Sequence, residues 1–499
     1  MCRTVRVDID KVRLGEQALL SSKASQLSIF FYGLGNISPA VKNNLLGAPL
    51  FYYYNNVLGL EAWLVSLALA ISLVADAISD PIIGYMSDYT KGRLGRRHPY
   101  ILASILPGSI CYFLLLSAEF SNNQIGLFAQ LLLLVTALRL AWTLYEVPRQ
   151  ALGAEISKDY HQRNQLHGIN MLFGWIGGVS IGYLMEAHLL GDSYDNLSGY
   201  RELAYWGAAA IFFTGIIFFL GTSRDIPNLE APRRGPPPTV KQIVRDILDT
   251  LNHRSWLVLF FSGVVFSVYV GLTTGLAFYW NSFLWEWKPS DVAIFGVVSF
   301  VGAMLISGFA GLLSSRFDKK RLAVGLFSAS IVIGPILLVL RLSDLWFGTS
   351  LLPPNGEKYG ALWWVMLGHS FISANIAILA WILVGSMTAD VVEDSQVQTG
   401  KRSEGLFFAG PQLVQKAISG LGFVIKGAIL TAVGFSVDAS FEEKVLSIEY
   451  LAAVIVVLGV ILPGIALYIF SKYEITKDSH QKNLDDLGYT HDSSNQTNH

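Results

Sequence analysis

The sequence predicts an all-α integral membrane protein with twelve transmembrane helices in two six-helix, pseudo-symmetric halves. Of the 499 residues, 52% are hydrophobic and only 15% are charged, whereas soluble globular proteins carry about a quarter charged residues. Windows such as 203–221, 321–340 and 451–470 are almost wholly apolar. Because about 20 apolar residues cross a bilayer core of about 30 Å, these windows are typical of transmembrane helices.

The apolar runs end at polar loops, and together they define the twelve predicted spans. Several spans exceed 25 residues, which indicates helices that tilt or extend beyond the bilayer. The predicted spans are 24–56, 62–88, 99–118, 124–154, 165–187, 203–221, 255–286, 290–314, 322–343, 360–389, 405–435 and 446–471.

Lys and Arg residues gather in alternate loops, which predicts the orientation of the chain. The loops 89–98, 222–254 and 315–321 are strongly basic, whereas the intervening loops hold only five basic residues: Arg201, Lys288, Arg341, Lys358 and Lys444. Basic loops stay on the cytoplasmic side. We therefore expect a multi-pass protein of the plasma (inner) membrane with both termini in the cytoplasm.

A Pro-rich, charged segment over 222–254 predicts a cytoplasmic linker between the halves. The motif "GYMSDYTKGRLGRR" follows the second span, and the similar "GLLSSRFDKKR" follows the eighth. Related halves are typical of transporters that hold their substrate near the membrane midplane. The predicted units are a cytoplasmic N-terminal segment (1–23), two six-helix halves (24–221 and 255–471), the linker, and a disordered cytoplasmic tail (472–499).

The composition also excludes several function classes. A net charge of −1 gives no reason to expect nucleic-acid binding, and Cys2 and Cys111 lie too far apart to form a redox or metal motif. The nine histidines are scattered, and no nucleophile motif is present. We therefore expect no enzyme, no structural metal and no cofactor, with Na⁺ considered only as a coupling ion.

Two acidic residues in the second span, Asp76 and Asp80, are the strongest functional signal. They stand four residues apart in "SLVADAISDP", so a helix places them on one face. Each ionised carboxylate costs about 2.5–3.5 kcal/mol at the bilayer centre, so such residues pair, bind a cation or carry a proton. The alternative is that they only pair with basic groups or cap the end of the helix.

The fourth span, "ALRLAWTLYEVPRQALGAE", carries a polar and aromatic stripe at helical spacing. Arg139, Trp142, Thr143, Glu146 and Gln150 fall on one face, which indicates a protein or aqueous interior. The alternative is that Arg139 and Glu146 merely pair with neighbouring helices.

Lysines stand inside two other spans. Lys42 and Asn44 lie in "SPAVKNNLLGAP", where Lys42 either neutralises an acid or attracts an anionic substrate, and Asn44 is a candidate for binding hydroxyl groups. Lys416 lies too deep in the eleventh span for easy snorkelling, so we expect it to pair with Asp76 or Glu146. A small cation that entered the carboxylates would then compete with Lys416. Lys426 is a better candidate for snorkelling.

These segments resemble a known family. "DAISDP" followed by "GYMSDYTKGRLGRRHPYIL" is similar to the signature of the glycoside–pentoside–hexuronide:cation symporters of the major facilitator superfamily. "YYYNNVLGL", "TLYEVPRQAL", "WILVGSMTADVVEDSQVQTGKRSEG" and "PQLVQKAISG" match the family in the same order over nearly the whole chain.

The resemblance implies the major facilitator fold and a cation site formed by Asp76, Asp80, Thr143 and Glu146. It implies that Lys416 couples the cation to transport and that Trp381 lies near a sugar. It also implies that the cytoplasmic loop after the second span gates the transporter. The residues of that gating motif are Asp88, Arg93, Gly95, Arg96 and Arg97.

The chain departs from the family where sugars bind. Ser79 replaces an asparagine between the two aspartates, which favours protons over Na⁺ as the coupling ion. The family's sugar-binding acid, arginine and tryptophan align near Ala40, Met171 and Gln150. Lys42 and Arg139 would suit a different, acidic sugar.

We therefore expect cation-coupled symport of a sugar, glycoside or sugar acid by alternating access, with Lys42, Asn44, Arg139, Trp142, Gln150 and Trp381 as candidate substrate-binding residues. The alternatives are transport of an amphipathic lipid such as a lysolipid, and a sensor that does not transport. A small molecule, a coupling cation and the lipid bilayer are the expected partners.

Overall fold

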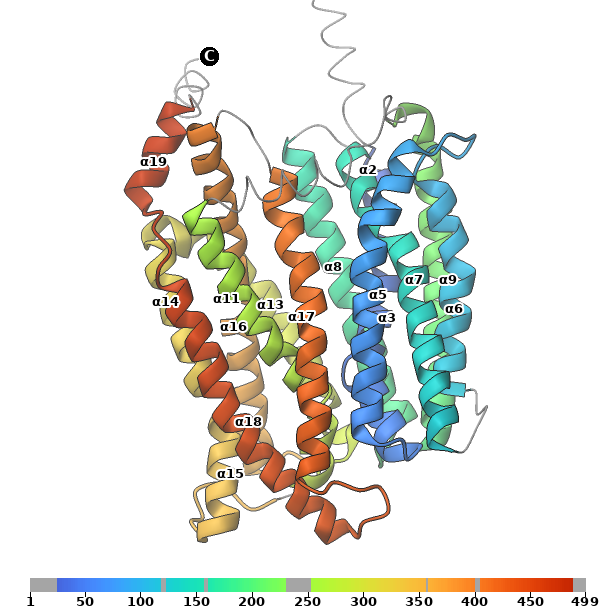
Figure 1. The fold of residues 1–499 in the computed structure, drawn as a ribbon, viewed down its shortest axis with the longest axis vertical. Coiled ribbons are helices and arrows are strands. Elements are labelled where there is room, and N and C mark those ends of the chain that lie inside the picture. Colours follow the sequence, from blue (N-terminus) through green and yellow to red (C-terminus); the bar gives the residue numbers. More distant parts are fainter. Residues whose placement is uncertain are drawn as a thin grey trace, which may run out of the picture.

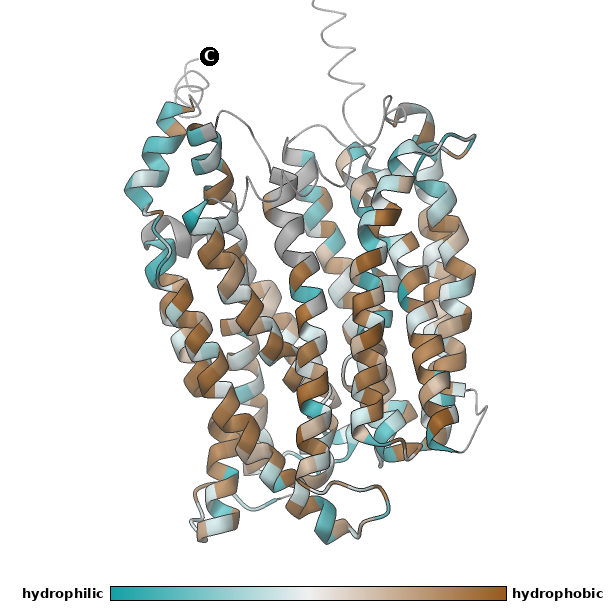
Figure 2. Ribbon diagram, viewed as in Figure 1, coloured by the Kyte–Doolittle hydropathy of each residue, from teal (hydrophilic) through white to brown (hydrophobic). Residues whose placement is uncertain are grey.

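The structure is a computed structural model, in which residues 25–117, 123–156, 160–229, 253–355, 358–399 and 404–487 are described. This part of the chain is helical and contains no β-strand. Eleven of its helical segments are long and apolar enough to cross a membrane. The helices run along one common direction, with apolar residues along their middles and polar residues gathered at both ends (Figures 1 and 2). The all-α membrane fold expected from the sequence is confirmed.

The long helices fall on the two sides of the linker. The first half contains α5 (Ala62–Tyr89), α6 (His98–Ser117), α7 (Gln124–Ile156), α8 (Tyr160–Leu184) with the π-helix η2 (Met185–Leu189), and α9 (Leu197–Thr222). The second half contains α11 (Arg254–Thr273), α12 (Ala277–Tyr279) with the π-helix η4 (Trp280–Leu284), α13 (Pro289–Arg316), α14 (Lys319–Ile333), α15 (Ile336–Phe347), α16 (Ala361–Thr399), α17 (Glu404–Ala432) and α18 (Phe441–Phe470).

The first predicted span, 24–56, is a chain of short helices rather than one helix, so it is absent from the eleven. The pieces are α2 (Gln26–Leu34), α3 (Ile37–Leu46), α4 (Ala48–Tyr52) and the π-helix η1 (Tyr53–Val57). Gly47 causes the second break, because its ψ of −120° is far from helical and Pro49 begins the next helix without a backbone donor. The ninth span is similarly divided between α14 and α15, at Gly334 and Pro335.

The linker between the halves and the C-terminal tail contain helical structure that the sequence did not predict. The linker region begins with a short 3₁₀ helix, η3 (Ser223–Asn228), and residues 230–252 lie outside the described residues. In the tail, which the sequence predicts to be disordered, residues Lys477–Asp486 form a further helix, α19. A capping box at Thr476 and Ser479 starts this helix, and Asn483 donates a hydrogen bond to Asp394 on α16. The expectation of disorder is therefore wrong for α19.

Small residues let the two halves approach closely along α5 and α17. A Cβ atom added to Gly427 would lie only 2.6 Å from the Ser66 Cβ, and one added to Gly420 would lie 3.5 Å from the Ala70 backbone. Small residues at membrane helix interfaces permit such close backbone packing. This contact brings the α17 face that carries Lys416 against the α5 face that carries Asp76 and Asp80.

A second set of contacts joins the halves at the end of the bundle that contains η1 and η4. The Tyr52 hydroxyl lies 3.0 Å from Asp195 in the first half and 3.1 Å from the Ser282 hydroxyl in the second. Asn281 donates to the Tyr194 hydroxyl at 2.9 Å, and the Tyr52 and Tyr279 rings meet edge to face at 5.0 Å. These buried aromatic and polar contacts close that end of the interface.

Candidate cation-coupling site

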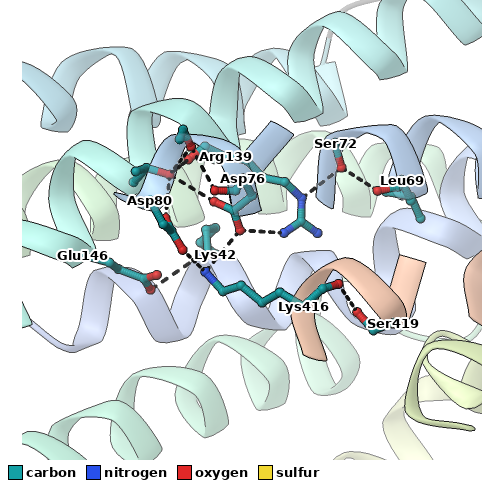
Figure 3. A network of polar contacts seen from close by, with 11 residues as sticks. Lys42, Leu69, Ser72, Asp76, Asp80, Arg139, Glu146, Lys416 and Ser419 are labelled. Carbon is teal, nitrogen blue, oxygen red and sulfur yellow. Dashed lines mark hydrogen bonds and ion pairs between the residues drawn. The ribbon is translucent and has the colours of Figure 1, made fainter. Parts of the chain in front are cut away.

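Four helices place charged side chains at one point inside the bundle (Figure 3). Asp76 and Asp80 lie one turn apart on α5, and α7 faces them with Arg139, Thr143 and Glu146. Lys42 comes from α3, and Lys416 comes from α17 in the other half. The structure thus brings together all four predicted cation-site residues and the predicted coupling lysine.

Thr143 lies between the two aspartates. Its hydroxyl oxygen is 3.0 Å from Asp76 Oδ1, 3.1 Å from Asp80 Oδ1 and 2.9 Å from the Ser79 hydroxyl. A hydroxyl has one hydrogen to donate, so Thr143 satisfies one carboxylate at a time and leaves acceptor capacity on the other. Two carboxylates and two hydroxyls therefore form a compact group of oxygen atoms.

Lys416 is the basic group that connects the halves. Its ammonium lies 2.8 Å from Asp80 Oδ2 and 3.3 Å from Asp76 Oδ2. The Lys416 side chain is 39% exposed, whereas that of Asp76 is only 10% exposed. Lys416 is consequently the most accessible base of the cluster.

Arg139 of the neighbouring helix α7 also contacts Asp76. Its Nε donates to the Ser72 hydroxyl at 2.9 Å, and its Nη1 lies 3.5 Å from Asp76 Oδ2. The Ser72 hydroxyl in turn donates to the Leu69 carbonyl at 2.7 Å. This chain of bonds on α5 fixes the guanidinium beside Asp76.

Lys42 occupies the other side of the cluster. Its ammonium lies 3.5 Å from Glu146 Oε1 and 5.5 Å from the centre of the Trp142 ring. The sequence left two roles open for Lys42: neutralising an acid or attracting an anionic substrate. The structure places Lys42 beside an acid, Glu146. The cluster then holds equal numbers of acids and bases: Asp76, Asp80 and Glu146 against Lys42, Arg139 and Lys416.

The six candidate substrate residues do not converge on one pocket. Lys42 and Arg139 belong to the charge cluster, and Gln150 is exposed on α7. Trp142 is buried, stacks on Tyr145 with ring centres 5.5 Å apart, and packs directly against Gly108 of α6. Trp381 lines a small pocket of about 70 Å³ within the second half.

Asn44 lines a much larger cavity between the halves, of about 950 Å³. Its walls come from α3, α8 and η2 on one side, and from α12, η4, α13 and α16 on the other. Binding sites for small molecules typically have volumes of about 300–1,000 Å³. Most of these lining residues were missed in the sequence, because their spacing on separate helices gives no local motif.

The basic loop after α5 forms a second buried charge cluster. Arg97 pairs with Asp88 at 2.5 Å and with Glu155 at 2.9 Å, and Arg96 also pairs with Glu155 at 2.9 Å. Gly95 has a φ of +70°, a left-handed conformation that glycine adopts readily. Arg93 is exposed. Glu155 at the end of α7, which sequence reasoning missed, contacts both buried arginines and balances their charge together with Asp88.

A corresponding cluster at the end of the second half involves α19. Lys319 lies 2.7 Å from Asp390, and His480 of α19 lies 3.3 Å from Glu393 and 3.6 Å from Asp390. Atoms of Asp390, Glu393 and His480 lie within 4.8 Å of one another. Because Lys319 already supplies a positive charge to Asp390, the group is best described as an ion-pair cluster that docks α19.

Lys426, the predicted snorkelling lysine, is instead fully buried. Its ammonium donates to the Thr274 carbonyl at 2.5 Å and lies 3.8 Å and 4.3 Å from the ring centres of Phe51 and Phe423. No carboxylate of the described residues lies within ion-pair distance of it. The close packing of α17 against α5 and α11 carries this lysine away from the bundle surface.

Comparison with known proteins connects the chain with membrane transport. A family model described as MFS/sugar transport protein matches residues 31–477. An uncharacterized symporter of Synechocystis is 25% identical, over 84% of this chain and 88% of its own length. The isoprimeverose transporter of Lactiplantibacillus pentosus is 21% identical, over 93% and 92%. A sodium-dependent lysophosphatidylcholine symporter of Danio rerio is 23% identical, over 95% and 91%.

A solved structure confirms the likeness of fold. The nucleoside transporter NupG superposes with a TM-score of 0.62 at 12% sequence identity, over 89% of this chain and the whole of that protein. At this identity the likeness concerns the fold alone.

Proposed function

Because the chain belongs to the MFS/sugar transport protein family, we propose that it is a secondary active transporter that couples entry of H⁺ or Na⁺ to uptake of a sugar, glycoside or sugar acid. The family is one of transporters and not of enzymes. The relatives compared here are named as symporters or transporters, and one of them is named as sodium-dependent. The chain is an integral, multi-pass membrane protein. The coupling ion, the substrate class and the roles of single residues are the content of the proposal.

The contact of Lys416 with Asp80 and Asp76 carries this proposal. The cluster contains equal numbers of acids and bases, so an added cation must displace a base or leave an excess of positive charge. Lys416 is the base best placed to leave, because it is the most exposed and belongs to the opposite half. Cation binding at Asp76 and Asp80 would therefore release the contact between the halves.

The donor atoms at this site suit a small, hard cation. Asp76 and Asp80 supply carboxylate oxygens, and Thr143 and Ser79 supply hydroxyls. Sodium ions favour such oxygen donors, and the paired carboxylates would equally take up a proton, because close acids do not ionise independently. Glu146 faces Lys42 and is one step removed from this oxygen group.

Alternating access would then use the two ends of the bundle. The Tyr52 and Asn281 contacts close the end that contains η1 and η4. If both termini are cytoplasmic, that end is extracellular and the conformation faces inward. The Asp88–Arg97–Glu155 cluster would hold the cytoplasmic ends of α5, α6 and α7 together while the halves rotate. Inward movement of one charge gains about 2.3 kcal/mol per 100 mV.

The test is uptake by proteoliposomes that contain the purified full chain. An imposed inward gradient of protons or Na⁺ should drive accumulation of a radiolabelled sugar above its external concentration. Control liposomes without a gradient should only equilibrate. If folded protein accumulates no sugar, glycoside or sugar acid under either gradient, the proposed function fails.

A lysolipid is the second candidate substrate, and the wall of the large cavity favours it. Most residues that line this cavity are apolar, among them Met171, Val179, Met185 and Met366. A relative from Danio rerio is named for lysophosphatidylcholine. Stabilisation of the purified protein by lysophosphatidylcholine but by no sugar, in a thermal-shift screen, would favour this candidate.

A further inference from the structure

The large cavity between the halves contains one charged side chain among the described residues that line it, Glu186. Glu186 lies in the π-helix η2, where α8 widens before its end. Single turns of π-helix occur frequently at functional sites, because they reorient a side chain that an α-helix would point elsewhere. Glu186 also falls within the apolar span Gln165–Leu189, and an ionisable residue inside a span marks a functional site by default.

The Glu186 carboxylate makes no hydrogen bond or ion pair with another described residue. The acids of the coupling cluster differ from it, because each of them faces a lysine or an arginine. Glu186 is half-buried and its oxygens are free to accept hydrogen bonds. An occupant of the cavity that donates hydrogens would satisfy them.

The other polar groups of the wall are neutral. Asn43 and Asn44 come from α3, Asn281 from η4, Ser299 from α13 and Ser370 from α16. The Asn43 side chain is exposed to the cavity, whereas Asn44 already donates to the Gly178 carbonyl. Amide and hydroxyl groups of this kind hydrogen-bond the hydroxyls of a sugar ring.

Aromatic side chains complete the wall. Trp175 and Tyr183 from α8, together with Phe278 and Phe295 from the second half, line the same cavity. The flat apolar faces of such rings pack against the C–H face of a sugar. Lys42 and Arg139, the bases that would have suited an acidic sugar, are bound to Glu146 and Asp76 instead and do not line this cavity.

We infer that Glu186 determines substrate specificity, because its carboxylate accepts hydrogen bonds from the hydroxyls of a neutral sugar and, in its ionised form, repels sugar acids. This inference rests on the proposed function, since it assumes that the cavity holds the transported molecule. It narrows the substrate from sugars and sugar acids to neutral, polyhydroxylated molecules.

Binding of matched sugars to the purified full chain tests the inference without transport. The pairs are glucose with glucuronate and galactose with galacturonate, whose members differ only at the sixth carbon. Dissociation constants come from isothermal titration and thermal shift. Wild-type protein should bind the neutral member of at least one pair and its uronate about tenfold or more weakly, because like charges repel strongly in a medium less polar than water.

The substitution Glu186→Gln removes the charge and keeps a polar group of the same shape. The ratio of the uronate to the neutral dissociation constant should fall about tenfold or more. Glu186→Asp keeps the charge and should keep discrimination against the uronate, which preserves the test if the glutamine variant folds poorly. The matched control is Glu202→Gln, an exposed glutamate on α9 outside the cavity, which should leave the ratio unchanged.

Two outcomes would overturn the inference. The first is a wild-type protein that binds no neutral sugar of the pairs, or that binds a uronate as tightly as its neutral partner. The second is a ratio that Glu186→Gln leaves unchanged. Either outcome is compatible with gradient-driven uptake in proteoliposomes, so failure of the inference is distinguishable from failure of the proposed function.

Discussion

The ammonium of Lys416 lies 2.8 Å from the carboxylate of Asp80, although 336 residues separate them and they belong to opposite halves of the bundle. Asp80 shares this ammonium with Asp76, and Thr143 contacts both aspartates from the neighbouring helix. A single basic side chain of the second half therefore contacts both aspartates of the first half.

Removing one of the two acids should uncouple transport from the gradient. Asp76→Asn leaves Arg139 and Lys416 with one fewer acid. The remaining carboxylate of Asp80 would therefore bind a cation only weakly. Accumulation of labelled substrate in proteoliposomes under a proton or Na⁺ gradient should fall to the level of empty liposomes. Asp438→Asn, in an exposed loop, is the control. Undiminished accumulation by Asp76→Asn would remove Asp76 from the coupling role.

Removing Lys416 should strengthen cation binding while it abolishes coupling. Lys416→Met leaves Asp76 and Asp80 short of one base, so the apparent affinity for the coupling cation should rise about tenfold. The measurement is the cation concentration that gives half-maximal substrate binding, in Na⁺ titrations and in pH titrations. Lys358→Met, which changes an exposed lysine, should have no such effect. An unchanged cation affinity would contradict competition by Lys416.

The close packing of α5 and α17 predicts a difference between two glycines. Gly427→Ala places its Cβ within 2.6 Å of Ser66 and should destabilise the protein by about 1–3 kcal/mol. Gly464→Ala on α18 meets no atom within 4 Å and should leave stability unchanged or slightly higher. The melting temperatures of the two variants in one detergent test this; equal values would argue against a tight interface.

The stability of the protein around the buried arginines of the loop after α5 should depend on Glu155. Because Glu155 contacts both Arg96 and Arg97, Glu155→Gln leaves uncompensated buried charge, and breaking buried pairs costs about 3–5 kcal/mol. Glu474→Gln breaks only an exposed pair with Arg254 and should cost less than about 1 kcal/mol. Unfolding in denaturant measures both, and similar losses in the two variants would contradict this account.

Lys426 should be replaceable by an apolar side chain of similar length. Its ammonium is buried against Phe51 and Phe423 with only the Thr274 carbonyl as a hydrogen-bond acceptor, and burial of a charge without an opposite charge is costly. Lys426→Met should therefore raise the melting temperature or leave it unchanged, whereas Lys426→Ala should lower it by leaving a cavity. A large loss of stability in Lys426→Met would show that the Thr274 carbonyl and the two rings stabilise the buried ammonium.

The sequence predicted the membrane fold and the family well, because hydrophobic runs and the signature in and after the second predicted span are local patterns. It also named the residues that the structure gathers around Asp76, because polar groups are rare inside apolar helices and so stand out. The break at Gly47 was missed, since a glycine between apolar residues does not distinguish a broken helix from a continuous one.

The substrate region was harder to read than the charge cluster. Trp142 and Gln150 were predicted to share a helical face with Thr143. In the structure Trp142 packs against α6, whereas Gln150, further along α7, is exposed. Glu186 belongs to no motif in the predicted span 165–187. Only the tertiary structure brings it to the same cavity as Asn43 and Asn281. Glu155 and α19 were likewise missed, because their partners lie on other helices.

The tight contact between Gly427 and Ser66 is a pivot point for α17 near the closed end of the bundle. Residues of α17 that lie further from this contact would therefore move further when the halves rotate. Lys416 is eleven residues from Gly427, or about 16 Å along the helix at about 1.5 Å per residue. A rotation of the halves by about 10° would carry its ammonium some 3 Å, on the order of the length of its contact with Asp80. A small rocking movement is therefore enough to break the ion pair, while the far end of α17 sweeps about twice that distance. In the proposed transport cycle, loss of the ion pair between Lys416 and Asp80 would therefore accompany a wider separation of the halves at the far end of α17.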